Sequence, residues 1–132
     1  MPFPETWIKA AVEQASGCLA YPMMAPEAAA LPYVVYGRQS TTRETTMPLS
    51  AGSNIPPIGT FILEIYAAKY TDAKTIADDV RQALHNFNGS ASGVTIRHAA
   101  LANERDGDPV FFDGQDTPTF TIEHTYEIRW EE

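Results

Sequence analysis

Phe120-Thr121-Ile122-Glu123-His124-Thr125-Tyr126-Glu127-Ile128-Arg129-Trp130 is the stretch of sequence that indicates the fold most clearly. Apolar or aromatic side chains alternate with polar ones throughout it, and only His124 interrupts the apolar series. Alternation with a period of two is typical of a β-strand that buries one face. We therefore expect a strand from Pro118 to Trp130, with one face on helices and the other facing water or a partner.

Two segments have the spacing of amphipathic helices. Apolar residues recur at helical spacing from Pro4 to Ser16, and a proline suits the first helical turn. A second helix is expected from a cap at Thr71 or Asp72 to about Phe87, with a stop at Asn88-Gly89. The apolar stripe of this second helix consists of Ile76, Val80, Ala83, Leu84 and Phe87.

Three further runs of β-branched and aromatic residues predict strands at Tyr33–Tyr36, Gly59–Tyr70 and Val94–Ala102. Gly37 and Arg38 are expected to end or bend the first of these. Tyr21 to Pro32 contains three prolines and is expected to be irregular. The order α-β-β-α-β-β predicts a single α+β domain over residues 1–132. Its sheet should be largely antiparallel, with about four strands and two helices on one face.

Two long segments connect these elements. Residues 39–57 are rich in Ser and Thr, and loops of this length are usually functional or disordered. A floppy loop and a mobile arm that orders against a neighbour both remain open. An acidic loop spans residues 103–117. The candidate residues for an oligomer or partner interface come from these two segments: Arg43, Glu44, Met47, Leu49, Ile55, Phe111 and Phe112.

Composition narrows the classes of function. The net charge is −8, from 9 basic and 17 acidic residues, which disfavours binding to phosphate backbones. The sequence shows neither a signal peptide nor a membrane span, so we expect a soluble protein made in a cytoplasm. Cys18 is the one cysteine, which excludes an internal disulfide. We expect Cys18 to be a small buried hydrophobe; the alternative, a nucleophile, lacks an identifiable base.

No residue pattern indicates catalysis. His85, His98 and His124 lack zinc spacing and are expected to be structural, although His98 and His124 could be neighbours across the sheet. A phosphate-binding glycine loop and a nucleophile elbow are both missing from the sequence. We therefore predict no catalytic, cofactor-binding or metal-binding residues and no enzyme. Four aspartates favour a solvated turn over a calcium site or an acid/base pair: Asp106, Asp108, Asp113 and Asp116.

The chain resembles a known family in the order, length and hydrophobic pattern of its elements. The segments that carry the resemblance are Leu31–Tyr36, Phe61–Tyr66, Asp72–Leu84, Val94–Ile96 and Thr121–Trp130. They are similar to the tail-completion and tail-terminator proteins of long-tailed bacteriophages, and so is the short first helix.

The resemblance implies a structural function without cofactors. Family members form rings, commonly of six subunits, that cap the tail tube at its head-proximal end. Such a ring contacts the tail tube protein and the head-tail connector or a neck protein, and DNA passes through it without specific binding. The resemblance thus implies a virion protein of the tail that assembles in the host cytoplasm. Two alternatives remain: another neck or head-tail joining component, or a small α+β enzyme or ligand-binding protein.

Overall fold

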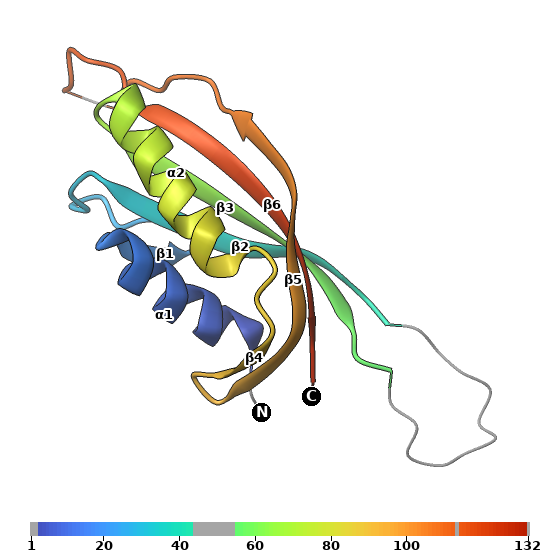
Figure 1. The fold of residues 1–132 in the computed structure, drawn as a ribbon. Helices are drawn as coiled ribbons and strands as arrows, with labels where there is room; N and C mark the ends of the chain where they lie inside the picture. Colours follow the sequence, from blue (N-terminus) through green and yellow to red (C-terminus); the bar gives the residue numbers. More distant parts are fainter. Residues whose placement is uncertain (1–2, 44–54, 113, 132) are drawn as a thin grey trace.

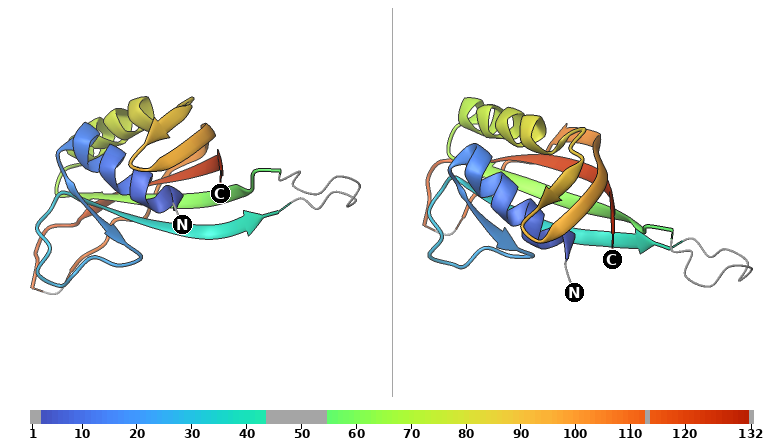
Figure 2. Two further views of the ribbon diagram at one scale, coloured as in Figure 1. Left: turned by 90° about the horizontal axis from the view of Figure 1, so that it is seen from below. Right: turned by 60° about the horizontal axis from the view of Figure 1, so that its bottom comes forward.

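The computed structural model describes residues 3–43, 55–112 and 114–131, which form one six-stranded sheet with two helices on one face (Figures 1 and 2). The strand order is β1-β2-β3-β6-β5-β4, and every neighbouring pair is antiparallel except β1–β2. The elements follow the chain as α1 (Pro4–Ser16), β1 (Leu19–Pro22), β2 (Tyr33–Thr42), β3 (Ile58–Ala67), α2 (Tyr70–Leu84), β4 (Gly89–Ala91), β5 (Val94–Asp106) and β6 (Phe120–Trp130).

The alternating stretch forms β6, which lies between β3 and β5 in the sheet. Its alternate side chains are buried beneath the helices, as the alternation predicted: Ile122, Tyr126, Ile128, Trp130 and also His124. Phe120, expected on the same face, is half-buried. β3 alternates in the same way, so both strands present an apolar surface to α1 and α2. The α+β fold with both helices on one face is confirmed.

Ile76, Val80 and Leu84 of the stripe predicted for the second helix are buried as expected, but Phe87 lies beyond the end of α2, and both ends of the helix differ from the prediction. The amide of Ala73 donates to the carbonyl of Lys69, so the first turn begins before Thr71, and no side chain caps it. The helix stops at Leu84 rather than near Phe87. The chain has already turned there, because the amide of Asn86 donates to Ala99 of β5.

The number of strands was underestimated, because two short edge strands depend on tertiary pairing. β1 pairs in parallel with β2 although it ends in Pro22, a residue that an edge strand tolerates. β4 is a three-residue partner of β5. β2 does not end at Gly37 and Arg38 but continues to Thr42, with a register shift between Arg38 and Ser40.

Both predicted long segments are therefore shorter than expected. Residues 39–42 belong to β2 and residues 103–106 to β5, because neighbouring strands satisfy their backbone groups. β2 and β3 continue as a pair to Thr42 and Ile58, beyond the end of β1, and this ribbon extends away from the helices (Figures 1 and 2). β6 pairs with β3 along it as far as Ile58, which stands opposite Arg129. Residues 44–54 lie outside the described residues.

Arg38 fixes the base of this ribbon against the helices. Its guanidinium lies 2.5 Å from the Glu5 carboxylate of α1 and stacks over two rings of the core. The distance from the guanidinium carbon to the ring centroid is 5.2 Å for Phe61 and 4.8 Å for Trp130. The direction in which the ribbon leaves the sheet is thereby set by packing and by charge together.

Candidate assembly surface

The face of the sheet opposite the helices carries a line of four aromatic side chains, which we call the aromatic row: Tyr21, Tyr33, Tyr66 and Phe112. Tyr33 of β2 stands opposite Tyr66 of β3, and their ring centroids are 5.1 Å apart. Tyr21 of β1 lies 6.0 Å from Tyr33, and Phe112 lies 6.4 Å from Tyr66. The row therefore crosses three strands at one end of the sheet and ends at the segment between β5 and β6.

Exposed apolar side chains border the aromatic row. Leu19 stands beside Tyr33 in the register of β1 and β2 and is 61% exposed, and Phe111 next to Phe112 is 64% exposed. Met23 is also exposed, and its sulfur lies over Gly37. Single exposed apolar residues are common, but a group of them at one end of a sheet is typical of an interaction surface.

The margin of the row is acidic. Glu64 stands opposite Glu123 in the register of β3 and β6. Arg105 of β5 donates two hydrogen bonds to the Glu123 carboxylate, at 3.1 and 3.3 Å, which relieves the repulsion between the two carboxylates. The Tyr66 hydroxyl donates to Glu64 at 2.5 Å. Burial and this hydrogen bond raise the pKa of Tyr66, so its hydroxyl remains a neutral donor at physiological pH.

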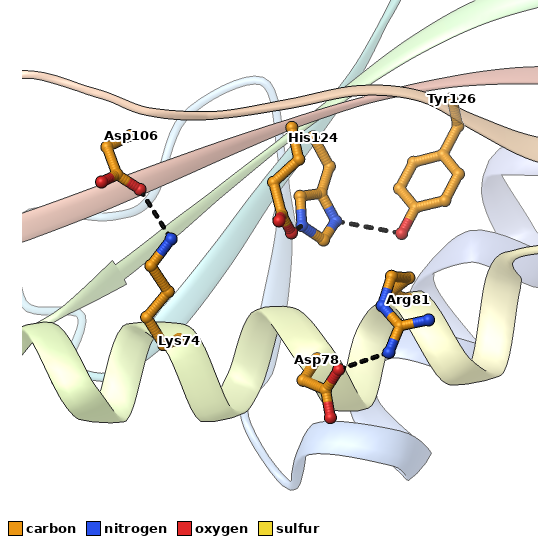
Figure 3. A network of polar contacts seen from close by, with 7 residues as sticks. Lys74, Asp78, Arg81, Asp106, His124 and Tyr126 are labelled. Carbon is orange, nitrogen blue, oxygen red and sulfur yellow. Dashed lines mark hydrogen bonds and ion pairs between the residues drawn. The ribbon is translucent and has the colours of Figure 1, made fainter.

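A second polar group lies on the helix side of the sheet, between α2 and the strands β5 and β6 (Figure 3). His124 is fully buried, with Nε2 2.5 Å from the Glu104 carboxylate and Nδ1 3.0 Å from the Tyr126 hydroxyl. Burial lowers the pKa of His124, although Glu104 opposes this shift. In the neutral imidazole, Nε2–H donates to Glu104 and Nδ1 accepts from Tyr126.

The polar residues around His124 connect α2 to β5, which indicates a structural role rather than a catalytic one. Lys74 of α2 lies 2.9 Å from Asp106 at the end of β5. His85, just after α2, accepts a hydrogen bond at 3.0 Å from the backbone amide of Leu101. These contacts join the helix to the strand at several points. Among the described residues, no group of three His, Cys, Asp or Glu is placed to hold a metal ion.

The predicted interface residues fall into three places. Phe112 belongs to the aromatic row and Phe111 to its border, so the structure brings these two together. Arg43 is exposed just beyond β2, and Ile55 is half-buried before β3; both lie at the far end of the ribbon from the row. Glu44, Met47 and Leu49 lie outside the described residues.

The structure tests the expectations for the histidines and for Cys18. His98 and His124 are not neighbours, because His98 stands opposite Arg129 and is exposed, whereas His124 is buried under α2. A register shift between Ile96 and His98 helps to place them on opposite faces. Cys18 is buried, as expected of a small hydrophobe.

The part of the chain that the structure describes contains no helix long and apolar enough to cross a membrane.

Sequence reasoning missed the tyrosines of the row. Tyr33 and Tyr66 lie in predicted strands, but Tyr21 lies in a stretch that was expected to be irregular. The only signal in the sequence is the frequency of Tyr near predicted strand ends, and it does not show that three strands align them. The antiparallel pairing of β2 with β3 brings Tyr33 and Tyr66 together, and the parallel pairing of β1 with β2 adds Tyr21.

Comparison with known proteins assigns the chain to a class of viral structural proteins. The family model described as tail completion protein gp17 matches residues 8–131. The chain therefore belongs to this family and is a structural protein of a phage tail. No curated protein sequence gives a significant match.

Solved structures show the same fold at low sequence identity. One similar chain comes from the virion of a native gene transfer agent particle, with a TM-score of 0.57 and 16% identity. That match covers 95% of this chain and 84% of the other. A second solved chain has a TM-score of 0.52 and 16% identity, and the match covers 100% of this chain and 99% of the other.

Proposed function

We propose that this protein forms a ring, with six subunits as the expected number, that caps the tail tube at its head-proximal end. The observation that carries the proposal is the match to the tail completion family over residues 8–131. The protein would then be part of the virion. Its partners would be copies of itself, the tail tube protein and a connector or neck protein.

The surface of the molecule supports assembly rather than catalysis. The face opposite the helices carries an exposed apolar area next to the aromatic row, and the β2–β3 ribbon extends away from the helices. A subunit with two such features at different ends of its sheet can contact two neighbours at once. If each subunit contacts the next in the same way, the copies form a closed ring when the rotations between successive subunits add up to one full turn.

The charge of the chain supports passage of DNA through the ring without specific binding. Each subunit has a net charge of −8, so the ring as a whole is strongly acidic. Acidic groups near the channel would repel the phosphate backbone and prevent DNA from adhering. The same charge opposes contact between subunits, so the contacts themselves are expected to be largely uncharged.

A phage that lacks the gene tests this proposal against the alternative of a neck component. If the protein caps the tube, electron microscopy should show tails of irregular length, because growth of the tube is not stopped. If the protein only joins head and tail, tails of normal length should accumulate without heads. The second result would contradict the capping function and favour the head-tail joining alternative.

A further inference from the structure

The aromatic row lies too far from the end of its own ribbon to be covered by it. Tyr33 is nine residues along β2 from Thr42, and Tyr66 is eight residues along β3 from Ile58. At about 3.3 Å per residue, these distances are about 30 and 26 Å. Any chain that reaches the row from the ribbon must therefore span almost the whole length of the sheet.

The apolar residues of the segment that joins β2 and β3, residues 43–57, do not cover this distance. Met47 is five residues and Leu49 seven residues from Thr42, and Ile55 is three residues from Ile58. A fully extended chain covers at most about 3.6 Å per residue, which gives about 18 Å for Met47, about 25 Å for Leu49 and about 11 Å for Ile55. Met47 and Ile55 thus stop well short of the aromatic row of their own subunit, and Leu49 stops short of Tyr33 even at full extension.

From these distances we infer that the aromatic row is the docking site for the 43–57 segment of a second copy of this chain. This inference rests on the proposed ring and names the surface through which its subunits contact one another. Each subunit would donate its segment to one neighbour and receive the segment of another on Tyr33, Tyr66 and Phe112. The contact is head-to-tail, which is the kind of interface that builds rings.

The chemistry of the two surfaces is complementary. The 43–57 segment contains one basic and one acidic residue, Arg43 and Glu44, so it has no net charge, and it carries apolar Met47, Leu49 and Ile55. An uncharged segment can approach a subunit of net charge −8 without the repulsion that two acidic surfaces would experience. Tyr33 is itself buried and Tyr66 and Phe112 are half-buried, so the exposed Leu19 and Phe111 beside them supply most of the apolar area open to the segment.

Photo-crosslinking between copies tests this docking directly. Phe111 is replaced by p-benzoylphenylalanine, and unlabelled and ¹⁵N-labelled proteins are mixed before ring assembly and illumination. We expect mass spectrometry to find the residue at 111 of one isotope joined to the tryptic peptide that begins at Glu44 of the other isotope. The same replacement at Phe3, which is 56% exposed and precedes α1, should give no link to that peptide.

Other crosslinking results would contradict the docking. If rings form but position 111 links to the helices of a neighbour, to the same copy or to nothing, the docking inference is wrong and the proposed function is unaffected. A wild-type chain that forms no ring with or without tail tubes would overturn both. A pair of charge variants provides a second readout. Phe111→Glu should abolish ring formation in light scattering while circular dichroism stays native, and Phe3→Glu should preserve the ring.

Discussion

The imidazole of His124 is fully buried on the helix side of the sheet. Glu104 of β5 and Tyr126 of β6 contact its two nitrogens, and Arg81 and Lys74 of α2 add positive charge nearby. Burial is the largest influence and lowers the pKa of His124 in the folded protein. Protonation is therefore easier in the unfolded chain, where the imidazole is hydrated.

This difference predicts that acid destabilises the protein through His124. Above the ordinary histidine pKa of 6.5, His124 is neutral in both states and the folded protein keeps its full stability. As the pH falls below 6.5, the unfolding free energy declines, because His124 takes up a proton more readily in the unfolded chain. Urea unfolding between about pH 7.5 and 5.5 should show falling stability in the wild type. His124→Gln should show a flatter dependence, whereas the exposed His98→Gln should behave like the wild type. Equal slopes for His124→Gln and the wild type would contradict this.

Gly59, near the start of β3, leaves space for two core rings. A Cβ placed on Gly59 would lie 2.5 Å from Cε2 of Phe61 and 2.8 Å from Cζ3 of Trp130. Gly59→Ala should therefore cost about 1–3 kcal/mol of unfolding free energy, because neither ring can move without disturbing the core. Thr60→Ala, on the opposite face, is the control. Chemical denaturation that gives the same midpoint for both variants would show that the rings adjust freely.

At the level of elements, α2 is held to the sheet by its apolar stripe. Leu84 is fully buried in the core. Leu84→Ala should cost about 2–5 kcal/mol of unfolding free energy, because it opens a cavity between helix and sheet. Arg81→Ala should leave the unfolding midpoint almost unchanged, since its ion pair with Asp78 is exposed. Equal losses in chemical denaturation would mean that the helix packs through another face.

The elements that sequence predicted well are those whose signal is local. The alternation in Phe120–Trp130 fixed the buried face of β6, and the apolar stripe of α2 fixed its orientation. β1 was missed because its four residues pair with β2, which follows ten residues later in the chain. The end of α2 was misplaced because Asn86 bonds to β5 instead of continuing the helix.

The candidate surface could be predicted only in part from the sequence, because it depends on pairing between strands that are distant in the chain. Phe111 and Phe112 stood out as aromatic residues in an acidic loop. The tyrosines that they join do not stand out, because the row exists only when β1, β2 and β3 lie side by side. The residues in 44–54 remain predicted contacts, and their role is part of the proposal.

At the level of the whole molecule, different parts of the chain are expected to carry folding and assembly. The core consists of buried residues between the helices and the sheet, and Arg43 and Ile55 lie just beyond the ends of β2 and β3. Replacing residues 44–54 by a tight turn should leave the thermal melting of the subunit close to that of the wild type, because it keeps the buried Pro57 and the Pro56 carbonyl that accepts a hydrogen bond from Arg129. It should also abolish ring formation in light scattering. A shortened protein that still forms rings would contradict the role of this segment in assembly.

The most direct test of the central claim is negative-stain electron microscopy of the purified protein mixed with isolated tail tubes. The proposal predicts rings in the protein alone and, in the mixture, a ring-shaped density on one end of each tube. Tubes with both ends bare at saturating protein, or with protein bound along their sides, would contradict a ring that caps the tail.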